Sequence, residues 1–323
     1  MNKAIRIQAY GGVEVLDFTD LALKHPGKGE ILLRHTAIGV NFIDTYHRSG
    51  LYPLQLPFVP GQEAAGVVEE IGEGVDEVDV GDRIVYFSPP GAYSQRRIMP
   101  ARNAIPIPDW ISDKDAAAIY LKGMTARYLL VDTFKVKKGD VVLFHAAAGG
   151  VGQLACRWAK ALGAMVIGTV GSDEKVISAL TNGCDHAINL LKENFADRVK
   201  EITLGKGVDV VYDSIGKDSF EMSLDCLKPR GLMVSFGNSS GPVAVASLGI
   251  LAAKGSLYLT RPTLAHYYPD RATEMAGAKE MFEALKNGHL HVHIGQQFNL
   301  ADAAKAHFAL ENRQTTGATI LLP

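Results

Sequence analysis

The segment HAAAGGVGQLACRWAKALGA, residues 145–164, decides the fold. It follows the apolar run DVVLF and leads into a helical pattern, which predicts a strand, a glycine loop and a helix. Ala147, Gly149 and Gly152 occupy the three positions of the G-x-G-x-x-G pattern, with alanine in the first. Gly149 lets the backbone approach a pyrophosphate, and Gly152 lets the helix pack closely against the strand.

The same loop supplies the predicted phosphate contacts. Free backbone N–H groups and the positive end of the helix dipole gather at the start of such a helix. An ordinary α/β domain with a tight glycine turn is the alternative interpretation. On the first interpretation, the cofactor-binding residues here are Ala148, Gly149, Gly150, Val151 and Gly152.

The end of the next strand favours NADP over NAD. NAD-binding domains usually place Asp or Glu about 20 residues past the glycines, to hold the ribose 2′-hydroxyl. This chain has Gly171 and Ser172 there, with Lys175 three residues later. A hydroxyl and an ammonium suit a 2′-phosphate, so we predict NADPH, or NADP⁺ when oxidised, as the cofactor. Asp173 and Glu174 oppose this choice unless they serve the N-terminus of the next helix.

Apolar strands alternate with helices from the glycine loop onward. This alternation predicts a doubly wound parallel sheet that is covered on both faces. The expected strands cover residues 140–148, 164–170, 186–190, 208–216, 231–237 and 256–262.

The two ends of the chain share a different pattern. The first 120 residues contain short β segments between Gly/Pro turns, and the terminal strand GATILLP matches them better than the doubly wound region. We therefore predict an α/β protein in which residues 123–261 form a dinucleotide-binding domain. This domain is inserted in a β-rich domain built from residues 1–122 and 262–323.

Composition restricts the classes of partner. The 323 residues include 33 Lys and Arg against 35 Asp and Glu, so the chain lacks the basic excess typical of a nucleic-acid binder. The longest apolar stretch, residues 243–253, is too short to span a membrane. The start shows no signal-peptide pattern, and the three cysteines form no disulfide framework. These features favour a cytoplasmic enzyme.

Over essentially its whole length the sequence resembles the medium-chain dehydrogenase/reductase superfamily. Its zinc alcohol dehydrogenases carry a Cys in G-V-C-H-x-D and a His in G-H-E. The corresponding segments here are GVNFIDTYHRSG and GQE, so Asn41 replaces the cysteine and Gln62 the histidine. Zinc prefers thiolate and imidazole ligands, and no cysteine precedes Cys156. We therefore expect no metal.

Within the superfamily the chain is similar to the zinc-free NADPH:quinone oxidoreductases, the group that includes zeta-crystallin. The resemblance implies a Rossmann domain inserted in a GroES-like domain, transfer of reducing equivalents from NADPH to a quinone, and a homodimer. It rests on the glycine loop and on NFIDTYHRSGLY (41–52), LPFVPGQEAAGVV (56–68), VVYDSIG (210–216), SFGNSSGPV (235–243), LTRPTL (259–264) and RQTTGATILLP (313–323).

The acceptor pocket is best placed at residues 41–52. Asn41 is a candidate to donate a hydrogen bond to the acceptor oxygen or to orient the nicotinamide amide. Tyr46 and Tyr52 can stack on a planar ring, and Asp44 is a candidate to orient a water or a ribose hydroxyl. Ordinary packing of the tyrosines and a capping role for Asp44 are the alternatives.

Further cofactor contacts follow from the resemblance, at the carboxyl ends of the later strands, where doubly wound folds bind ligands. Arg313 is the candidate for closing the cleft onto a phosphate. The expected contacts at the strand ends are Ser214, Gly216, Phe236, Gly237, Asn238, Leu259 and Arg261. Thr125, before the first strand of the doubly wound domain, is the candidate for touching a phosphate or a ribose.

Two alternative functions are compatible with the same features, and a homodimer is the expected assembly. An enone or alkenal reductase would use the same site, since it too adds a hydride to an electron-poor carbon conjugated to a carbonyl. A non-catalytic NADPH-binding protein, crystallin-like or RNA-binding, is the alternative outside enzymes. The strand at 256–262 would form the apolar edge of the sheet, and pairing it across a two-fold axis gives the expected homodimer.

Overall fold

The computed structural model describes residues 2–87 and 89–323, which divide into two compact units. One unit contains the chain up to Lys122 together with Val292–Pro323, and the other contains Gly123–His291. The insertion of an α/β region between two β-rich ends is therefore confirmed. None of the described helices is long and apolar enough to cross a membrane.

Strand β3 (Glu30–Val40) is the centre of the first unit. It pairs antiparallel with β4 (Glu63–Ile71), β6 (Arg96–Pro100) and β15 (Ala318–Leu322). The path continues through β5 (Arg83–Phe87) and β7 (Ile105–Pro106) on one side and β14 (Ile294–Asn299) on the other. A separate two-stranded sheet joins β1 (Asn2–Arg6) to β2 (Asp17–Leu21).

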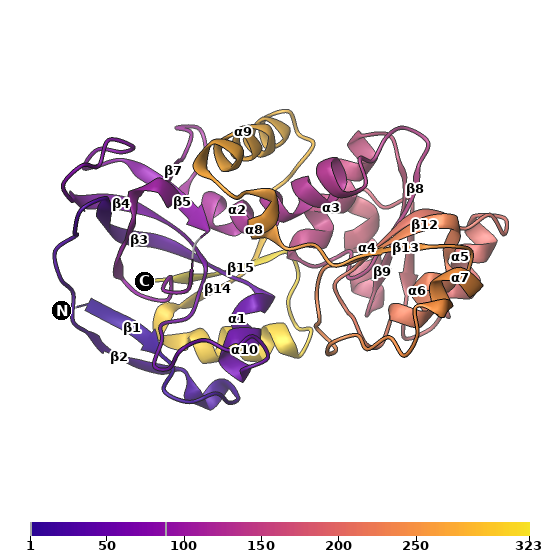
Figure 1. The fold of residues 1–323 in the computed structure, drawn as a ribbon, viewed down its shortest axis with the longest axis horizontal. Helices are drawn as coiled ribbons and strands as arrows, with labels where there is room; N and C mark the ends of the chain where they lie inside the picture. Colours follow the sequence, from indigo (N-terminus) through magenta and orange to yellow (C-terminus); the bar gives the residue numbers. More distant parts are fainter. Residues whose placement is uncertain (1, 88) are drawn as a thin grey trace. The chain divides into compact units, whose positions relative to one another are not determined.

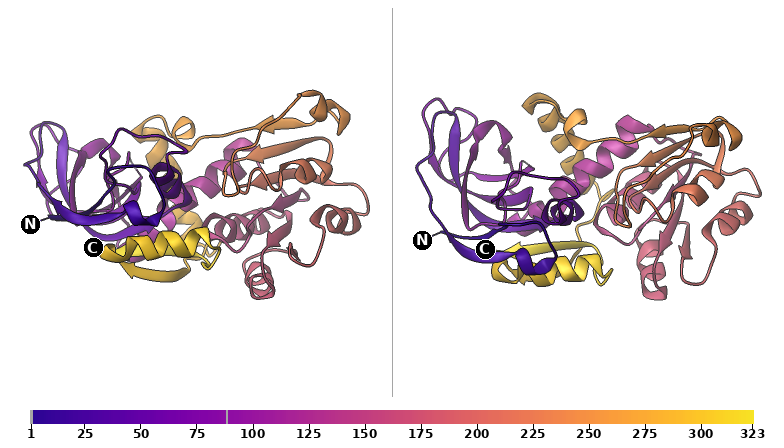
Figure 2. Two further views of the ribbon diagram at one scale, coloured as in Figure 1. Left: turned by 90° about the horizontal axis from the view of Figure 1, so that it is seen from below. Right: turned by 60° about the horizontal axis from the view of Figure 1, so that its bottom comes forward.

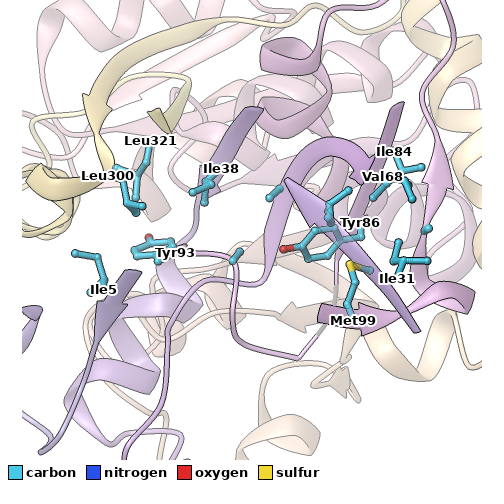
Figure 3. Close-up of a cluster of buried hydrophobic side chains, with 14 of the residues drawn as sticks. Ile5, Ile31, Ile38, Val68, Ile84, Tyr86, Tyr93, Met99, Leu300 and Leu321 are labelled. Atoms are coloured by element: carbon cyan, nitrogen blue, oxygen red, sulfur yellow. The ribbon is translucent and has the colours of Figure 1, made fainter. Parts of the chain in front are cut away.

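The two ends of the chain share one core in this unit. In β15, Leu321 lies opposite Ile38 of β3, so the last strand is built into the sheet formed by the first hundred residues. Figure 2 shows the yellow C-terminal segment beside the indigo N-terminal strands. The close-up in Figure 3 shows the shared apolar cluster, in which ten side chains are labelled: Ile5, Ile31, Ile38, Val68, Ile84, Tyr86, Tyr93, Met99, Leu300 and Leu321.

Three α-helices accompany these strands. They are α1 (Phe42–Ser49), α2 (Asp113–Arg127), which crosses the division between the units, and α10 (Ala303–Glu311). The Ser112 hydroxyl accepts a hydrogen bond from Asp115 N at 3.1 Å and so caps the N-terminus of α2. The helical chain continues directly after α2 as a π-helical turn, η3 (Tyr128–Thr133).

The second unit is a six-stranded parallel sheet with the order β10-β9-β8-β11-β12-β13. Figure 1 shows its strands with helices packed around them. The chain starts in the middle at β8, moves outward to β10, and returns to β11 beside β8. The strands are β8 (Val141–Phe144), β9 (Met165–Val170), β10 (His186–Asn189), β11 (Val208–Asp213), β12 (Leu227–Ser235) and β13 (Tyr258–Thr260).

The helices of this unit follow the expected alternation. Helix α3 begins inside the glycine loop, at Gly150, and α7 is confined to Gly249–Ala253. Their bounds are α3 (Gly150–Ala161), α4 (Asp173–Thr181), α5 (Phe195–Ile202), α6 (Phe220–Asp225), α7 (Gly249–Ala253), α8 (Leu264–Tyr267) and α9 (Arg271–Lys286).

The second division of the chain lies at 291/292, about thirty residues after the expected boundary at 262. Helix α9 accounts for the difference because it packs on the C-terminal part of α2. A Cβ on Gly277 would lie 2.6 Å from the Tyr268 ring and 3.0 Å from Met124, and Arg127 donates to Glu280 at 2.9 Å. The helix therefore belongs with the α/β unit.

Candidate active site

The α/β unit has a topological switch point at β8 and β11. Successive strands run outward from β8 in one direction and from β11 in the other, so the loops at their carboxyl ends diverge there. Ligands of open α/β sheets bind at such a point. The glycine loop follows β8, and Asp213 closes β11, so the structure brings both segments to the same edge.

The glycine loop is shaped for an anion. Gly149 is the N-cap of α3, with extended backbone and no side-chain cap, so the first-turn N–H groups of α3 are left for an external acceptor. A Cβ on Gly149 would meet only Ala146 O, at 3.2 Å. A Cβ on Gly152 would lie 2.3 Å from that same oxygen, so the helix packs too closely here for any other residue. Both observations fit a pyrophosphate.

The residues at the end of β9 fit a further phosphate. Ser172 is the N-cap of α4 and accepts from Lys175 N at 3.3 Å, which leaves its hydroxyl proton available as a donor. Asp173 is held by Lys192 and Asn189, at 2.6 and 2.8 Å, and these hydrogen bonds lower the pKa of its carboxyl. Gly171 is exposed, with open space around its Cα. The charge of Asp173, one of the two nearby carboxylates, is therefore paired.

Polar groups anchor the loop after β11. The buried Asp213 carboxylate accepts from Ile215 N and Gly216 N, at 2.7 and 3.1 Å, and from the Ser219 hydroxyl at 2.7 Å. Gly216 has φ +94°, a conformation that favours glycine. The expected contacts Ser214 and Gly216 thus lie on a loop whose shape the Asp213 carboxylate fixes.

The remaining expected cofactor residues fall in several places. Phe236, Gly237 and Asn238 directly follow β12, and Leu259 lies in β13. Arg261 is exposed and donates to Ser235 O at 3.0 Å. Thr125 is buried in α2, whereas Arg313 is exposed just after α10, in the unit formed by the chain ends.

The four residues expected in the acceptor pocket form one cluster around α1. Asn41 is the N-cap of α1, and Asp44 Oδ2 accepts from Asn41 N at 2.9 Å. Tyr46 and Tyr52 meet edge to face with ring centroids 5.2 Å apart, and Tyr52 N donates to Tyr46 O. A short helix and the turn after it therefore position all four.

Asp44 is more deeply buried than a residue that touches substrate would be. It is 0 % exposed, and its Oδ2 also accepts from the Tyr93 hydroxyl at 3.0 Å. Burial raises the pKa of its carboxyl to about 7. Among the described residues Oδ1 has no hydrogen-bond partner. Asp44 therefore does cap α1, as the alternative interpretation expects. Its Oδ1 is the atom that remains to orient a water or a ribose hydroxyl.

Two residues that the sequence analysis did not select complete the cluster. Glu63, the acidic residue of GQE, is fully buried and accepts from Asn41 Nδ2 at 2.8 Å. Lys122 Nζ donates to the same oxygen, Glu63 Oε2, at 2.9 Å, and Leu121 N donates to Oε1 at 2.6 Å. No local sequence signal marks Lys122 and Glu63 as partners, since 59 residues separate them.

A second buried network extends from Asp44 to the C-terminal helix. The Tyr93 hydroxyl contacts His307 Nε2 at 3.0 Å, and Arg48 lies 3.2 Å from His307 Nδ1. Arg48 also makes a bidentate ion pair with Glu311. Burial lowers the pKa of His307 to about 3, so the ring is neutral at neutral pH. This network ties α1 to α10.

The positions of the two zinc ligands in zinc alcohol dehydrogenases carry amide side chains here. Asn41 donates one side-chain N–H to Glu63. Gln62, which directly precedes Glu63 in the sequence, is half-buried. Residues 2–87 and 89–323 contain no group of three or more His, Cys, Asp or Glu side chains able to hold a metal ion. The expectation that no zinc takes part stays a prediction.

Comparison with known families defines the class. Residues 27–109 match the alcohol dehydrogenase GroES-like domain, and residues 150–285 match the zinc-binding dehydrogenase family. These matches and the fold place the chain in the medium-chain dehydrogenase/reductase superfamily.

Full-length relatives define the family. The chain is 51 % identical over 325 residues to a quinone oxidoreductase of Pseudomonas aeruginosa, with 100 % of both chains covered. The solved structure of Escherichia coli quinone oxidoreductase complexed with NADPH has a TM-score of 0.97 and 49 % identity, covering 99 % of this chain and 100 % of that one. A 2-haloacrylate reductase of Burkholderia sp. is 49 % identical over 333 residues, with 100 % and 99 % covered. The chain belongs to the quinone oxidoreductase family.

Proposed function

We propose that this protein reduces quinones with NADPH. The observation that carries the proposal is the identity of about one half, over the full length, to curated quinone oxidoreductases. The E. coli relative, described as a complex with NADPH, supports the choice of cofactor. NADPH supplies a hydride from nicotinamide C4, and the chain supplies binding and orientation.

The residues present fit this cofactor. The first turn of α3 would hold the pyrophosphate, with Gly149 and Gly152 giving the close approach. Ser172 and Lys175 are the proposed partners of the 2′-phosphate, and the ion pair with Lys192 offsets the negative charge of Asp173. Loops after β11, β12 and β13 would hold the remainder.

The cluster around α1 is the proposed acceptor site. Tyr52 is half-buried and offers an aromatic ring on which a flat quinone can stack, with the buried Tyr46 ring edge to face against it. Asn41 has an amide N–H beyond the one given to Glu63. We propose that this site works without zinc, since the ligand positions carry Asn41 and Gln62. Metal analysis of active protein tests this point, and activity that a chelator abolishes and zinc restores would refute it.

The direct test is steady-state oxidation of NADPH by the purified protein with 1,4-naphthoquinone. We expect turnover with NADPH and at least tenfold lower kcat/KM with NADH. NADPH binding without oxidation by any quinone would instead support a non-catalytic role, whether crystallin-like or RNA-binding.

A second candidate reaction is reduction of an electron-poor alkene conjugated to a carbonyl or carboxyl group. The 2-haloacrylate reductase, at 49 % identity, favours it specifically. Parallel assays with 2-chloroacrylate, an unsaturated ketone and the quinone decide between the two. A kcat/KM at least tenfold higher for either alkene would overturn the quinone assignment.

We further propose a homodimer through the edge strand β13. Among the strands of residues 2–87 and 89–323, β13 pairs with β12 alone, and Tyr258 is 61 % exposed, so the edge is open to a second copy. Sedimentation of the wild type and of Tyr258→Asp tests the pairing: a dimer that the substitution leaves intact would contradict it. A cytoplasmic location remains a prediction for cell fractionation.

A further inference from the structure

Two hydrogen-bond donors converge on one buried oxygen at the start of α1. Asn41 Nδ2 and Lys122 Nζ both donate to Glu63 Oε2, at 2.8 and 2.9 Å. The other carboxylate oxygen accepts from Leu121 N. The carboxylate is thereby satisfied by three donors, and it fixes where both side-chain nitrogens lie.

The Lys122 ammonium, in contrast, has more N–H donors than hydrogen-bond acceptors around it. An ammonium group has three N–H donors, and among the described residues only Glu63 accepts from it. The side chain is 6 % exposed, against 0 % for Glu63, so the small remaining access belongs to the cation. Buried polar groups nearly always have at least one hydrogen-bond partner, and Glu63 fills that role for Lys122, which leaves two N–H donors for a further acceptor.

The backbone is also shaped around this carboxylate. A Cβ on Gly39 would lie 2.1 Å from Glu63 Oε2 and 2.5 Å from Ala117 O. Gly39 therefore leaves the room that Glu63 occupies. Replacing a buried ion pair by apolar residues is often neutral or stabilising, so stability alone is a weak reason for keeping one.

We propose that Lys122 Nζ and Asn41 Nδ2 together bind the acceptor oxygen on which negative charge develops, and that Glu63 positions both donors. The inference rests on the proposed reductase function. A hydride, which is a proton with an electron pair, passes from nicotinamide C4 to the acceptor, so that NADPH is oxidised to NADP⁺ and the acceptor oxygen becomes anionic. A fixed ammonium and amide N–H stabilise that charge, and a proton from solvent then completes the product. Lys122 thus supplies a positive charge beside Asn41, the position of a zinc ligand in the zinc alcohol dehydrogenases.

The matched test is the double variant Lys122→Met/Glu63→Gln, which removes both charges and leaves the net charge unchanged. We expect kcat with 1,4-naphthoquinone to fall about 100-fold while the Kd for NADPH changes less than threefold. Lys3→Met/Asp20→Asn removes an exposed ion pair of the same unit and should leave kcat unchanged. An unchanged kcat in Lys122→Met/Glu63→Gln would overturn the proposal.

Glu63→Gln alone separates positioning from structure. The ammonium remains, so we expect a smaller loss of kcat than in the double variant, with KM for the quinone raised. A purely structural role would instead lower Tm while kcat per folded protein stays at the wild-type value, and that result would refute positioning by Glu63.

A binding experiment makes the inference independent of turnover. 4-Nitrophenol is a probe for the anionic oxygen, because its phenolate and phenol absorb at different wavelengths. With NADP⁺ present, we expect the wild type to shift bound probe toward phenolate and Lys122→Met/Glu63→Gln to lose at least tenfold in affinity. Equal affinity and spectra would overturn the oxygen site. A wild type that binds phenolate through Lys122 yet never oxidises NADPH would refute the proposed function and leave this site standing.

Discussion

The glycine loop and the cluster around α1 are built by different means. The loop takes its donors from the backbone of one short segment, residues 148–152, at the end of a strand and the start of a helix. The α1 cluster assembles side chains that lie 22 and 59 residues apart in the chain, and it buries charge. A backbone site tolerates exchange of many side chains but no added Cβ at its close contacts, whereas a site made of buried charges depends on each partner.

The single substitution Lys122→Met has the largest expected effect on stability, because it removes one charge from the buried α1 cluster. It leaves the Glu63 carboxylate buried without its cation, which should lower the unfolding free energy by about 3–5 kcal/mol. Urea denaturation measures the change. The double variant with Glu63→Gln should recover most of the loss, and if single and double variants are equally unstable, the charge pairing is not the cause.

The pH dependence of stability tests the other buried carboxylate. Asp44 has its pKa raised from 3.8 to about 7 by burial, so between these values the folded state holds a proton that the unfolded state has released. Stability from this group therefore falls as the pH rises through that window. We expect Asp44→Asn to gain on the order of 4 kcal/mol relative to the wild type between about pH 4 and pH 8.

The wild type and Asp44→Asn must be compared with each other because His307 has the opposite effect on the pH dependence of stability. Burial lowers its pKa to about 3 from 6.5, so its contribution to stability is lost as the pH falls through that range. Both proteins keep His307, and its slope cancels in the difference. Parallel stability curves for the wild type and Asp44→Asn would contradict the raised pKa.

A single carbon added to the glycine loop tests the phosphate site that its backbone forms. Gly152→Ala would place a Cβ 2.3 Å from Ala146 O, so we expect a loss of about 1–3 kcal/mol in stability and a much weaker affinity for NADPH. Gly171→Ala is the matched control for stability, since no atom lies within 4 Å of its added Cβ. Equal stability of the two variants would show that the loop does not require close packing at Gly152.

The smallest expected effect concerns the choice of cofactor. Ser172→Asp with Lys175→Ala adds a negative charge and removes a positive one beside the proposed 2′-phosphate. We expect NADPH affinity to fall about thirtyfold, roughly 2 kcal/mol, with little change for NADH. Lys200→Ala, an exposed change on α5, is the control, and equal losses for both cofactors would refute the 2′-phosphate assignment.

Local pattern was enough to predict the fold and the backbone site. The glycine spacing and the alternation of apolar strands with helices predicted the inserted parallel sheet, and the structure confirms that fold. Those features depend on residues close together in sequence. The later boundary of the inserted unit could not be predicted, because it follows from the packing of α9 on α2 through Gly277 and Met124.

The α1 cluster could be predicted from the sequence only in part. Residues 41–52 were selected because they lie in one segment that matches a family. Lys122 and Glu63 were missed because their partnership exists only after β4 and α2 pack together. The network from Asp44 through Tyr93 to His307 spans 214 residues between its last two members, and no periodicity or motif reveals such a contact.

The most direct test of the account is a single turnover with NADPH that carries deuterium at the transferable C4 position. Protein saturated with this cofactor is mixed with 1,4-naphthoquinone, and the nicotinamide absorbance is followed. We predict that the absorbance decays on mixing, and that it decays more slowly for the deuterated cofactor than for the protiated one. Bound cofactor whose absorbance stays constant in the presence of the quinone would contradict it.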